Sequence, residues 1–213
     1  MFNCSKKTNG VICKKRGYTM EEDNRIETAL STLRTMFERR KLDTSTETIT
    51  TDNKKMEKVK LYTIGTILVC FSKKEKVLAG DITNIITFAE ENGHTTGIVI
   101  VAMSAPSDNV LRLVKSHSKN RLTFFHIWQL QFDITTHRMA MPHRILSEEE
   151  KAKIFELYKI SSPEPLPAID SQDTMIKWIG AVPGDVIEVT RHSDTAGRSL
   201  YYRHCVENVN AAE

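Results

Sequence analysis

The chain has 213 residues and a mass of 24.3 kDa, with 40% hydrophobic and 27% charged residues. This composition is typical of a globular protein, and a chain of this length buries roughly 70% of its unfolded surface without a disulfide or metal staple. Its longest apolar run, residues 98–103, is far shorter than the roughly 20 residues that span a bilayer. The first residues lack the apolar segment of a secretory signal, and the four cysteines form no C-x-x-C pair, so we expect reduced thiols in a cytosolic or nuclear protein.

Charge is distributed unevenly along the chain. Residues 1–146 contain 23 Lys/Arg and 15 Asp/Glu, a net charge of +8, whereas residues 147–213 contain 7 and 12, a net charge of −5. This asymmetry indicates two units with different partners, nucleic acid for the basic part and a basic protein for the acidic part. Two ordinary solvated surfaces are the alternative reading of the same charges.

The first third of the chain is expected to contain helices and strand structure. Apolar residues at helical spacing predict a helix over residues 21–41, with acidic residues at its start and basic residues at its end. Residues 43–60, rich in Thr and Lys, are expected to form a solvated loop or an irregular strand. Residues 61–71 are rich in β-formers. A second helix, capped by Asp81, is expected to end at Gly93.

Strands and helices then alternate. Residues 98–103 predict a buried strand, Pro106 opens a helix to about residue 118, and residues 121–128 form the next strand. This order predicts an α/β layer with parallel neighbouring strands. The aromatic residues of the last strand are expected in the core rather than on a base-stacking platform: Phe124, Phe125 and Trp128.

The last third of the chain combines short elements. Residues 139–146 are expected to be a connection, and Ser147 with Glu150 forms a capping box for a helix to about residue 159. The Pro-rich residues 161–167 exclude regular helix. A short helix over residues 173–179 is expected to stop at Gly180.

A turn and a hairpin are expected to follow this short helix. Pro183-Gly184 fits the central positions of a type II turn. Residues 186–191 and 200–206 then form a hairpin, with Gly197 available for positive φ in its connection.

Motifs of catalysis are missing from the chain. It contains no Gly-rich phosphate loop, no H-E-x-x-H and no G-x-S-x-G, and its histidines are scattered. We therefore expect no catalytic residue, no metal and no cofactor. A metal-dependent nuclease stays open as an alternative, with Asp81 and Glu75-Lys76 as loosely spaced candidates. Basic clusters such as Lys14-Lys15-Arg16 are suited to sequence-independent phosphate contacts.

A set of residues at fixed spacings closely resembles the fifth-subunit family shared by nuclear RNA polymerases I, II and III, and its C-terminal part also resembles the small archaeal RNA polymerase protein related to that family. The set covers about a third of the chain and consists of Pro142-His143, Leu146, Glu148-Glu149, Leu157-Tyr158, Leu166-Pro167-x-Ile169, Asp173, Gly180, Gly184-x-Val186, Arg191-x-Ser193-x-Thr195-Ala196-Gly197-Arg198 and Tyr202-Arg203.

The first 140 residues are similar to the family more weakly. Ala105-Pro106-Ser107 resembles the family's Thr-Pro-Ser loop near downstream DNA, with Ala105 in place of the threonine. Residues 13–18 are similar to its Arg-Gly-Tyr start. Asp173-Thr174 stands where the family has Asp-Pro. These departures indicate a divergent eukaryotic or a viral member.

The resemblance implies an α+β fold of two domains: an N-terminal jaw domain of residues 1–140 with an α/β layer, and a small C-terminal assembly domain of residues 141–213 with a β-hairpin. It implies a non-catalytic subunit of a DNA-directed RNA polymerase, located in the nucleus, or in the host cytoplasm or virion if viral. The C-terminal domain would dock on the largest subunit and the jaw would lie beside downstream duplex DNA. A transient polymerase-binding transcription adaptor is the other alternative.

Two sets of residues follow from this resemblance. The implied docking residues are Leu166, Pro167, Ile169, Gly180, Gly184, Arg191, Ser193, Thr195, Ala196, Gly197, Arg198, Tyr202 and Arg203. The implied DNA-proximal residues are Lys14, Lys15, Arg16, Ala105, Pro106 and Ser107.

The hairpin chemistry fits docking on physical grounds. Small residues before Arg198 permit close backbone approach, and three arginines along the two strands offer planar donors for carboxylates or carbonyls. The alternative is that Gly197 serves only the turn and the arginines only solvate the sheet edge.

Overall fold

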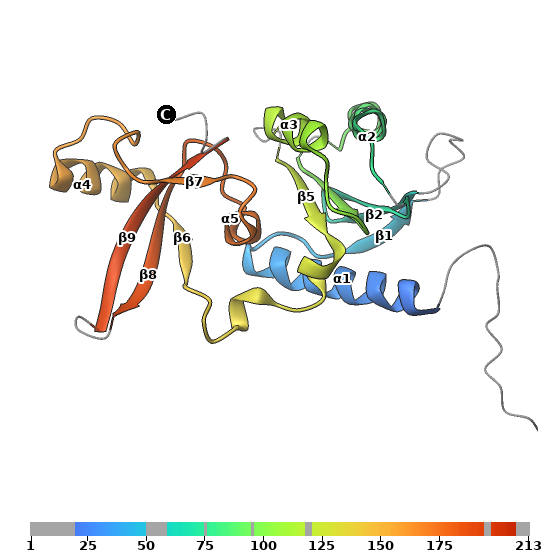
Figure 1. Cartoon of the computed structure of the whole chain (residues 1–213), viewed down its shortest axis with the longest axis horizontal. Helices are drawn as coiled ribbons and strands as arrows, with labels where there is room; N and C mark the ends of the chain where they lie inside the picture. Colours follow the sequence, from blue (N-terminus) through green and yellow to red (C-terminus); the bar gives the residue numbers. More distant parts are fainter. Residues whose placement is uncertain are drawn as a thin grey trace, which may run out of the picture.

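The chain folds around two β-sheets, as the computed structural model shows (Figure 1). The structure describes residues 20–49, 59–74, 76–94, 96–117, 121–193 and 197–207. The first sheet has the strand order β1-β2-β3-β4-β5 and the second β6-β8-β9-β7. This is an α+β fold of two domains, as expected. No helix among the described residues is long and apolar enough to cross a membrane.

The first sheet is partly antiparallel and partly parallel. Its elements in chain order are α1 (Met20–Arg39), β1 (Thr46–Ile49), β2 (Val59–Ile64), β3 (Ile67–Ser72), α2 (Ala79–Glu91), β4 (Ile98–Ala102), α3 (Asp108–Ser116), β5 (Leu122–His126), η3 (Ile127–Leu130) and η4 (Ile134–Thr136). Strands β1 to β3 pair antiparallel, whereas β3, β4 and β5 pair parallel. The predicted alternation of strands and helices with parallel neighbours is confirmed from β3 onward.

Helices cover both faces of this sheet, with α1 on one face and α2 and α3 on the other (Figure 1). In β3, Val69 and Phe71 pack in the α1 core, while Leu68 and Cys70 pack in the α2 and α3 core. A strand buried on both faces has a continuous apolar sequence rather than an alternating one. This is why β3 and β4 are buried along their whole length.

The region of residues 61–71 contains two strands and a turn rather than one strand run. Ile64 and Ile67 are the last paired residues of β2 and β3, so Gly65 lies in the two-residue loop that joins the strands. Its φ of +57° suits glycine, and a Cβ there would lie 2.6 Å from the carbonyl oxygen of Asp43. The residues before it, expected to form a solvated loop or an irregular strand, contain the short strand β1 at the sheet edge.

Two predicted helix starts are wrong by a few residues. The N-cap of α2 is Leu78, and Asp81 lies three residues later, where its carboxylate accepts a hydrogen bond from the Leu78 N–H at 3.0 Å. The N-cap of α3 is Ser107, so this helix starts two residues after Pro106. Both shifts arise because an acidic residue or a proline suits several positions of a first turn.

The prediction that three aromatic residues lie in the core holds for two of them. Phe124 and Phe125 are buried, but Trp128 is 54% exposed. Strand β5 ends at His126, and Trp128 lies in the 3-10 helix η3 with the guanidinium of Arg25 4.7 Å from its ring centroid. The strand alternation therefore does not extend to Trp128.

The second sheet is small and carries the hairpin. Its elements are β6 (His143–Ile145), α4 (Glu148–Tyr158), β7 (Ala168–Asp170), α5 (Thr174–Ile179), β8 (Val186–Ser193) and β9 (Gly197–Val206). Strand β8 pairs antiparallel with β6 and β9, and β7 pairs parallel with β9. Helix α5 contributes Ile176 to the core of this sheet, whereas α4 has no buried residue.

Local sequence signals in this part are confirmed. Ser147 and Glu150 form the capping box of α4, and Asp173 caps α5. Helix α5 ends at Gly180 with a φ of +76°. The turn at Gly184 has a φ of +100° and is closed by a hydrogen bond between residues 185 and 182 of 3.1 Å, as a type II turn requires.

Candidate docking surface and domain junction

The hairpin of β8 and β9 presents its arginines on two faces. Residues directly opposite in an antiparallel pair share a face, and Arg191 pairs with Ser199 while Arg198 pairs with His192. Arg191 and Arg203 therefore lie on the face that carries α5, and Arg198 lies on the face of α4. Both Arg191 and Arg198 are exposed, so the hairpin offers cationic donors on each side.

The α4 face of the hairpin is organised by charge and aromatic contacts. Arg144 bridges Glu150 at 2.7 Å and Glu188 at 3.0 Å. The ring of Tyr202 packs edge-on against Tyr158, with centroids 6.1 Å apart. Burial, followed by the charge of Glu188, raises the pKa of Tyr202, so it stays a neutral hydroxyl. The same face carries exposed apolar side chains, Leu157 and Leu200.

The α5 face of the hairpin is hollowed by a groove of about 520 Å³. Arg191, Tyr201 and Arg203 line it from the hairpin, and Met141 and Met175 line it from the segment before β6 and from α5. The guanidinium of Arg203 donates to the carbonyl of residue 168 at 3.2 Å and lies 5.3 Å from the Tyr201 ring centroid. Methionine and tyrosine around arginine form an adaptable, partly apolar surface suited to protein contact.

Other expected docking residues have structural positions. Ile169 is buried in the small core, and Gly184 forms the turn before β8. The carbonyl of Pro167 accepts a hydrogen bond from the His204 N–H at 2.9 Å, which extends the β7 and β9 pairing, and Leu166 beside it is half-buried.

The hairpin tip is only partly described. Thr195 and Ala196 lie outside the described residues, as does the side chain of Ser193. At the described end of the tip, Gly197 has a φ of +68° with open space around its Cα. Docking at all of these positions stays a prediction.

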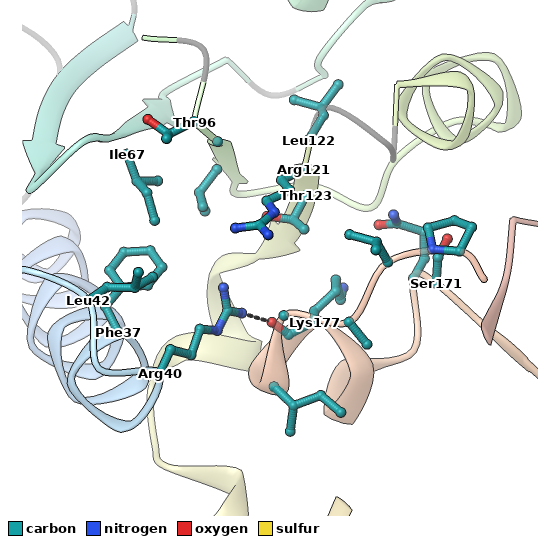
Figure 2. A pocket seen from close by; sticks show the side chains of 18 residues that line it. Phe37, Arg40, Leu42, Ile67, Thr96, Arg121, Leu122, Thr123, Ser171 and Lys177 are labelled. Atoms are coloured by element: carbon teal, nitrogen blue, oxygen red, sulfur yellow. Dashed lines mark hydrogen bonds between the residues drawn. The ribbon is translucent and has the colours of Figure 1, made fainter. Parts of the chain in front are cut away.

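Sequence reasoning missed the junction between the two sheets. The cationic side chains of Arg40 and Lys177 donate hydrogen bonds across it. Arg40, just after α1, donates through Nε to the carbonyl of Trp178 at 2.9 Å and through Nη2 to the carbonyl of Lys177 (Figure 2). The Trp178 side chain itself packs in the core of the first sheet beneath α1. Gly180 makes this contact possible, because a Cβ there would lie 2.9 Å from Cζ and Nη1 of Arg40.

Lys177 crosses the junction in the opposite direction. Its buried Nζ donates to the carbonyl of Phe124 at 2.9 Å and to Oε1 of Gln129 at 3.4 Å, and it lies 4.6 Å from the Phe125 ring centroid. Burial lowers the pKa of Lys177 to about 8, against the smaller raising effect of Asp173 and Asp170. Asp170 is paired with Lys115 of α3 at 2.7 Å, which adds a third contact between the sheets.

The expected DNA-proximal loop lies at the carboxyl end of the parallel strands. Ala105 and Ser107 are exposed between β4 and α3, and Pro106 is half-buried between them. Basic residues gather at the same sheet end, because β2 begins where β3 ends: Lys60 pairs with Asp23 at 2.8 Å, and Lys73 follows β3 directly. Lys14, Lys15 and Arg16 lie outside the described residues.

Among the described residues, the loosely spaced nuclease candidates do not come together as a site. The carboxylate of Asp81 is taken by the Leu78 N–H and by Lys74, while Glu75 lies outside the described residues. Among the described residues, no three His, Cys, Asp or Glu side chains gather as metal ligands would.

Comparison with known proteins locates the resemblance in the second sheet. Residues 132–205 match the family model described as RNA polymerase Rpb5, C-terminal domain. Over 78 residues, 37% of this chain, the sequence is 50% identical to the DNA-directed RNA polymerase subunit Rpo5 of Pyrococcus horikoshii and covers 94% of that protein. The chain belongs to the Rpb5 family. The matched Rpb5 segment runs from just before η4 to the end of β9, and so includes the hairpin and α5.

Similarity to a eukaryotic member reaches into the first sheet. The DNA-directed RNA polymerases I, II, and III subunit rpabc1 of Dictyostelium discoideum is 28% identical over 142 residues, 66% of this chain and 72% of that protein. The Rpo5 of Methanosarcina mazei is 43% identical over 77 residues, 36% of this chain and 97% of that protein. The strong identity is therefore confined to the part shared with the short archaeal proteins.

Proposed function

We propose that this Rpb5-family chain is a non-catalytic subunit of a multisubunit DNA-directed RNA polymerase. In this proposal the C-terminal domain, residues 141–213, docks on the largest subunit, and the N-terminal domain, residues 1–140, forms part of the jaw beside downstream duplex DNA. The observation that carries the proposal is the 50% identity across 94% of an archaeal protein named as a polymerase subunit. The relative named for polymerases I, II and III supports a nuclear location.

Docking through the C-terminal domain is supported by what this domain leaves exposed. A small sheet with one short packed helix has two accessible faces, and the hairpin projects Arg191 and Arg198 from opposite sides. Exposed Leu200 and Tyr201 follow on β9, one on each face. Arginine and tyrosine are among the residues that carry most of the binding energy in protein interfaces.

A place beside DNA is supported by the charge of the first domain. The net charge of +8 over residues 1–146 favours an anionic neighbour. The loop of Ala105 to Ser107 opens at the sheet end where Lys60, Lys73 and Lys74 lie. Such contacts would be with phosphates, independent of sequence and sensitive to salt.

The test of assembly is affinity purification of the tagged full chain from its native source at high salt, with partners identified by mass spectrometry. We expect the large polymerase subunits at equal stoichiometry. In parallel, Gly197→Val replaces a residue with a φ of +68° by a β-branched one and should abolish recovery of the polymerase. Gly93→Val is the matched control, since Gly93 has a φ of +74° with open space around it but lies in the first domain.

The outcomes distinguish a wrong polymerase assignment from a wrong docking surface. Recovery of the chain alone, or with unrelated proteins, would refute the polymerase assignment. Normal recovery of the Gly197→Val chain would leave the polymerase assignment standing and refute docking through the hairpin. Equal loss with both glycine variants would trace the effect to general destabilisation and count against a specific hairpin contact.

A further inference from the structure

A cavity lies at the junction between the two sheets and takes its lining from both. Its volume is about 220 Å³. Residues from the end of α1, from the strand edges around β4 and β5, and from residues 171–183 surround it (Figure 2). This volume equals about seven water molecules at roughly 30 Å³ each, and it is below the roughly 300–1,000 Å³ of sites for drug-sized ligands. The cavity therefore suits a small ion with a few waters.

The lining is positively charged. Arg40, Arg121 and Lys177 contribute to it, and no Asp or Glu is among the described residues that line it. Figure 2 shows the guanidinium groups of Arg40 and Arg121 turned toward one another from opposite walls. Arg40 holds the carbonyls of residues 177 and 178 through Nε and Nη2, which leaves its Nη1 beside Gly180, a residue that also lines the cavity.

Arg121 is positioned without a partner. Its side chain is exposed at the cavity mouth and makes no hydrogen bond or ion pair with any described residue. Burial lowers the pKa of Arg40 to about 10, and the neighbouring charge of Arg121 adds to this shift. Two like charges facing across a cavity repel one another, and an anion between them would reverse that repulsion.

Polar groups on the opposite wall are also unpaired. Ser171 is 4% exposed, and its Oγ has no hydrogen-bond partner among the described residues. The side-chain oxygen of Gln172 is likewise buried and without a partner there. The Ser171 hydroxyl can donate a hydrogen bond to an anion, whereas the Gln172 oxygen only accepts and suits a water molecule beside it. Buried polar groups without partners are rare in native proteins.

We propose that this cavity is a binding site for a small oxyanion of the phosphate class, held between the guanidinium groups of Arg40 and Arg121. The guanidinium of Arg121 offers a planar fork of donors that matches the oxygens of phosphate, and Arg40 adds its remaining Nη1 donor. Bound there, the anion joins a residue that follows α1 to a residue that precedes β5, both in the domain of the first sheet, at the wall that residues 171–183 of the second domain complete. The site is separate from the hairpin and does not depend on the polymerase assignment.

The probe is inorganic phosphate, titrated into the full chain while sodium chloride keeps the ionic strength constant. Isothermal titration calorimetry measures binding directly, and urea unfolding measures the stabilisation that a ligand of the folded state produces. Arg121→Asn removes the charge and keeps a residue type that tolerates the φ of +55° found there. Arg112→Gln on α3 is the control, because it removes an exposed charge that makes no hydrogen bond or ion pair with described residues.

We expect phosphate to bind the wild-type chain and the Arg112→Gln chain equally, and to bind the Arg121→Asn chain at least about 10-fold more weakly, a change of about 1.4 kcal/mol. Equal binding to wild type and Arg121→Asn would overturn the proposal. So would the absence of any heat or stabilisation beyond that of chloride. Because the Arg121 side chain is exposed and unpaired, its replacement leaves the fold intact and the comparison remains valid.

Discussion

The contact between Arg40 and the end of α5 gives a sharp prediction through Gly180. Replacing Gly180 with alanine adds a Cβ 2.9 Å from Cζ and Nη1 of Arg40, at a φ of +76°. The left-handed backbone costs an L-residue about 1–2 kcal/mol. The guanidinium is the far end of a flexible side chain and can withdraw, so the steric cost equals the loss of its two hydrogen bonds to α5 carbonyls.

Gly93→Ala isolates the backbone part of that cost. Gly93 also follows a helix, has a φ of +74°, and has no atom within 4 Å of an added Cβ. Hydrogen bonds from a charged donor contribute about 1.5–3 kcal/mol each when intact, and partial exposure of Arg40 reduces this. We expect urea unfolding to show that Gly180→Ala loses about 2 kcal/mol more than Gly93→Ala.

A double-mutant cycle tests the reasoning itself. In an Arg40→Met background the guanidinium is gone, so Gly180→Ala should cost no more than Gly93→Ala does. If both alanine variants lose the same stability in the wild-type background, the Arg40 contact contributes nothing and the junction is held by other groups. If the Gly180→Ala cost is unchanged by Arg40→Met, the clash is not with Arg40.

Three further outcomes are expected. The pKa of Lys177 lies at about 8 in the folded chain against 10.5 ordinarily, so the unfolded state binds more protons between these values and stability rises with pH there. Between about pH 7.5 and about pH 9.5 the wild type should gain about 2 kcal/mol more than Lys177→Met in urea unfolding, and equal gains would contradict this. Ser147→Ala removes the N-cap of α4 and should cost about 1 kcal/mol by the same assay, and a loss too small to measure would show that the cap does not stabilise the helix. Leu33→Ala deletes a fully buried side chain beneath the first sheet and should lower unfolding stability by about 2–5 kcal/mol, whereas a loss under about 1 kcal/mol would place Leu33 outside the core.

Elements with local signals could be predicted from the sequence. The capping box at Ser147, the αL stop at Gly180 and the turn at Gly184 depend on residues adjacent in the chain, and all three are present. The three-residue strands β6 and β7 were not predicted. A strand of three residues has too short an alternation to read, and it exists only because β8 and β9 offer partners.

For the candidate surfaces too, only the features marked by local sequence could be predicted. The hairpin was predicted because alternation and turn residues mark it, but the separation of Arg191 from Arg198 onto opposite faces depends on register. Trp128 was assigned to the core because it follows two buried phenylalanines, and the 3-10 helix after β5 turns it outward. Lys177 had no signal at all, because its partners lie about 50 positions earlier in the chain.

The junction couples the proposed docking domain to the proposed jaw through side chains buried in both hydrophobic cores. Trp178 of α5 is part of the first sheet's core, while Ile176, two residues earlier, is part of the second sheet's core. One short helix therefore has side chains in both hydrophobic cores, and the hydrogen bonds of Arg40 and Lys177 hold its C-terminal half from opposite directions. A partner that holds the second sheet would thus set the orientation of the first sheet as well. In the proposed assembly, this coupling would hold the first domain at a defined angle to the partner of the second.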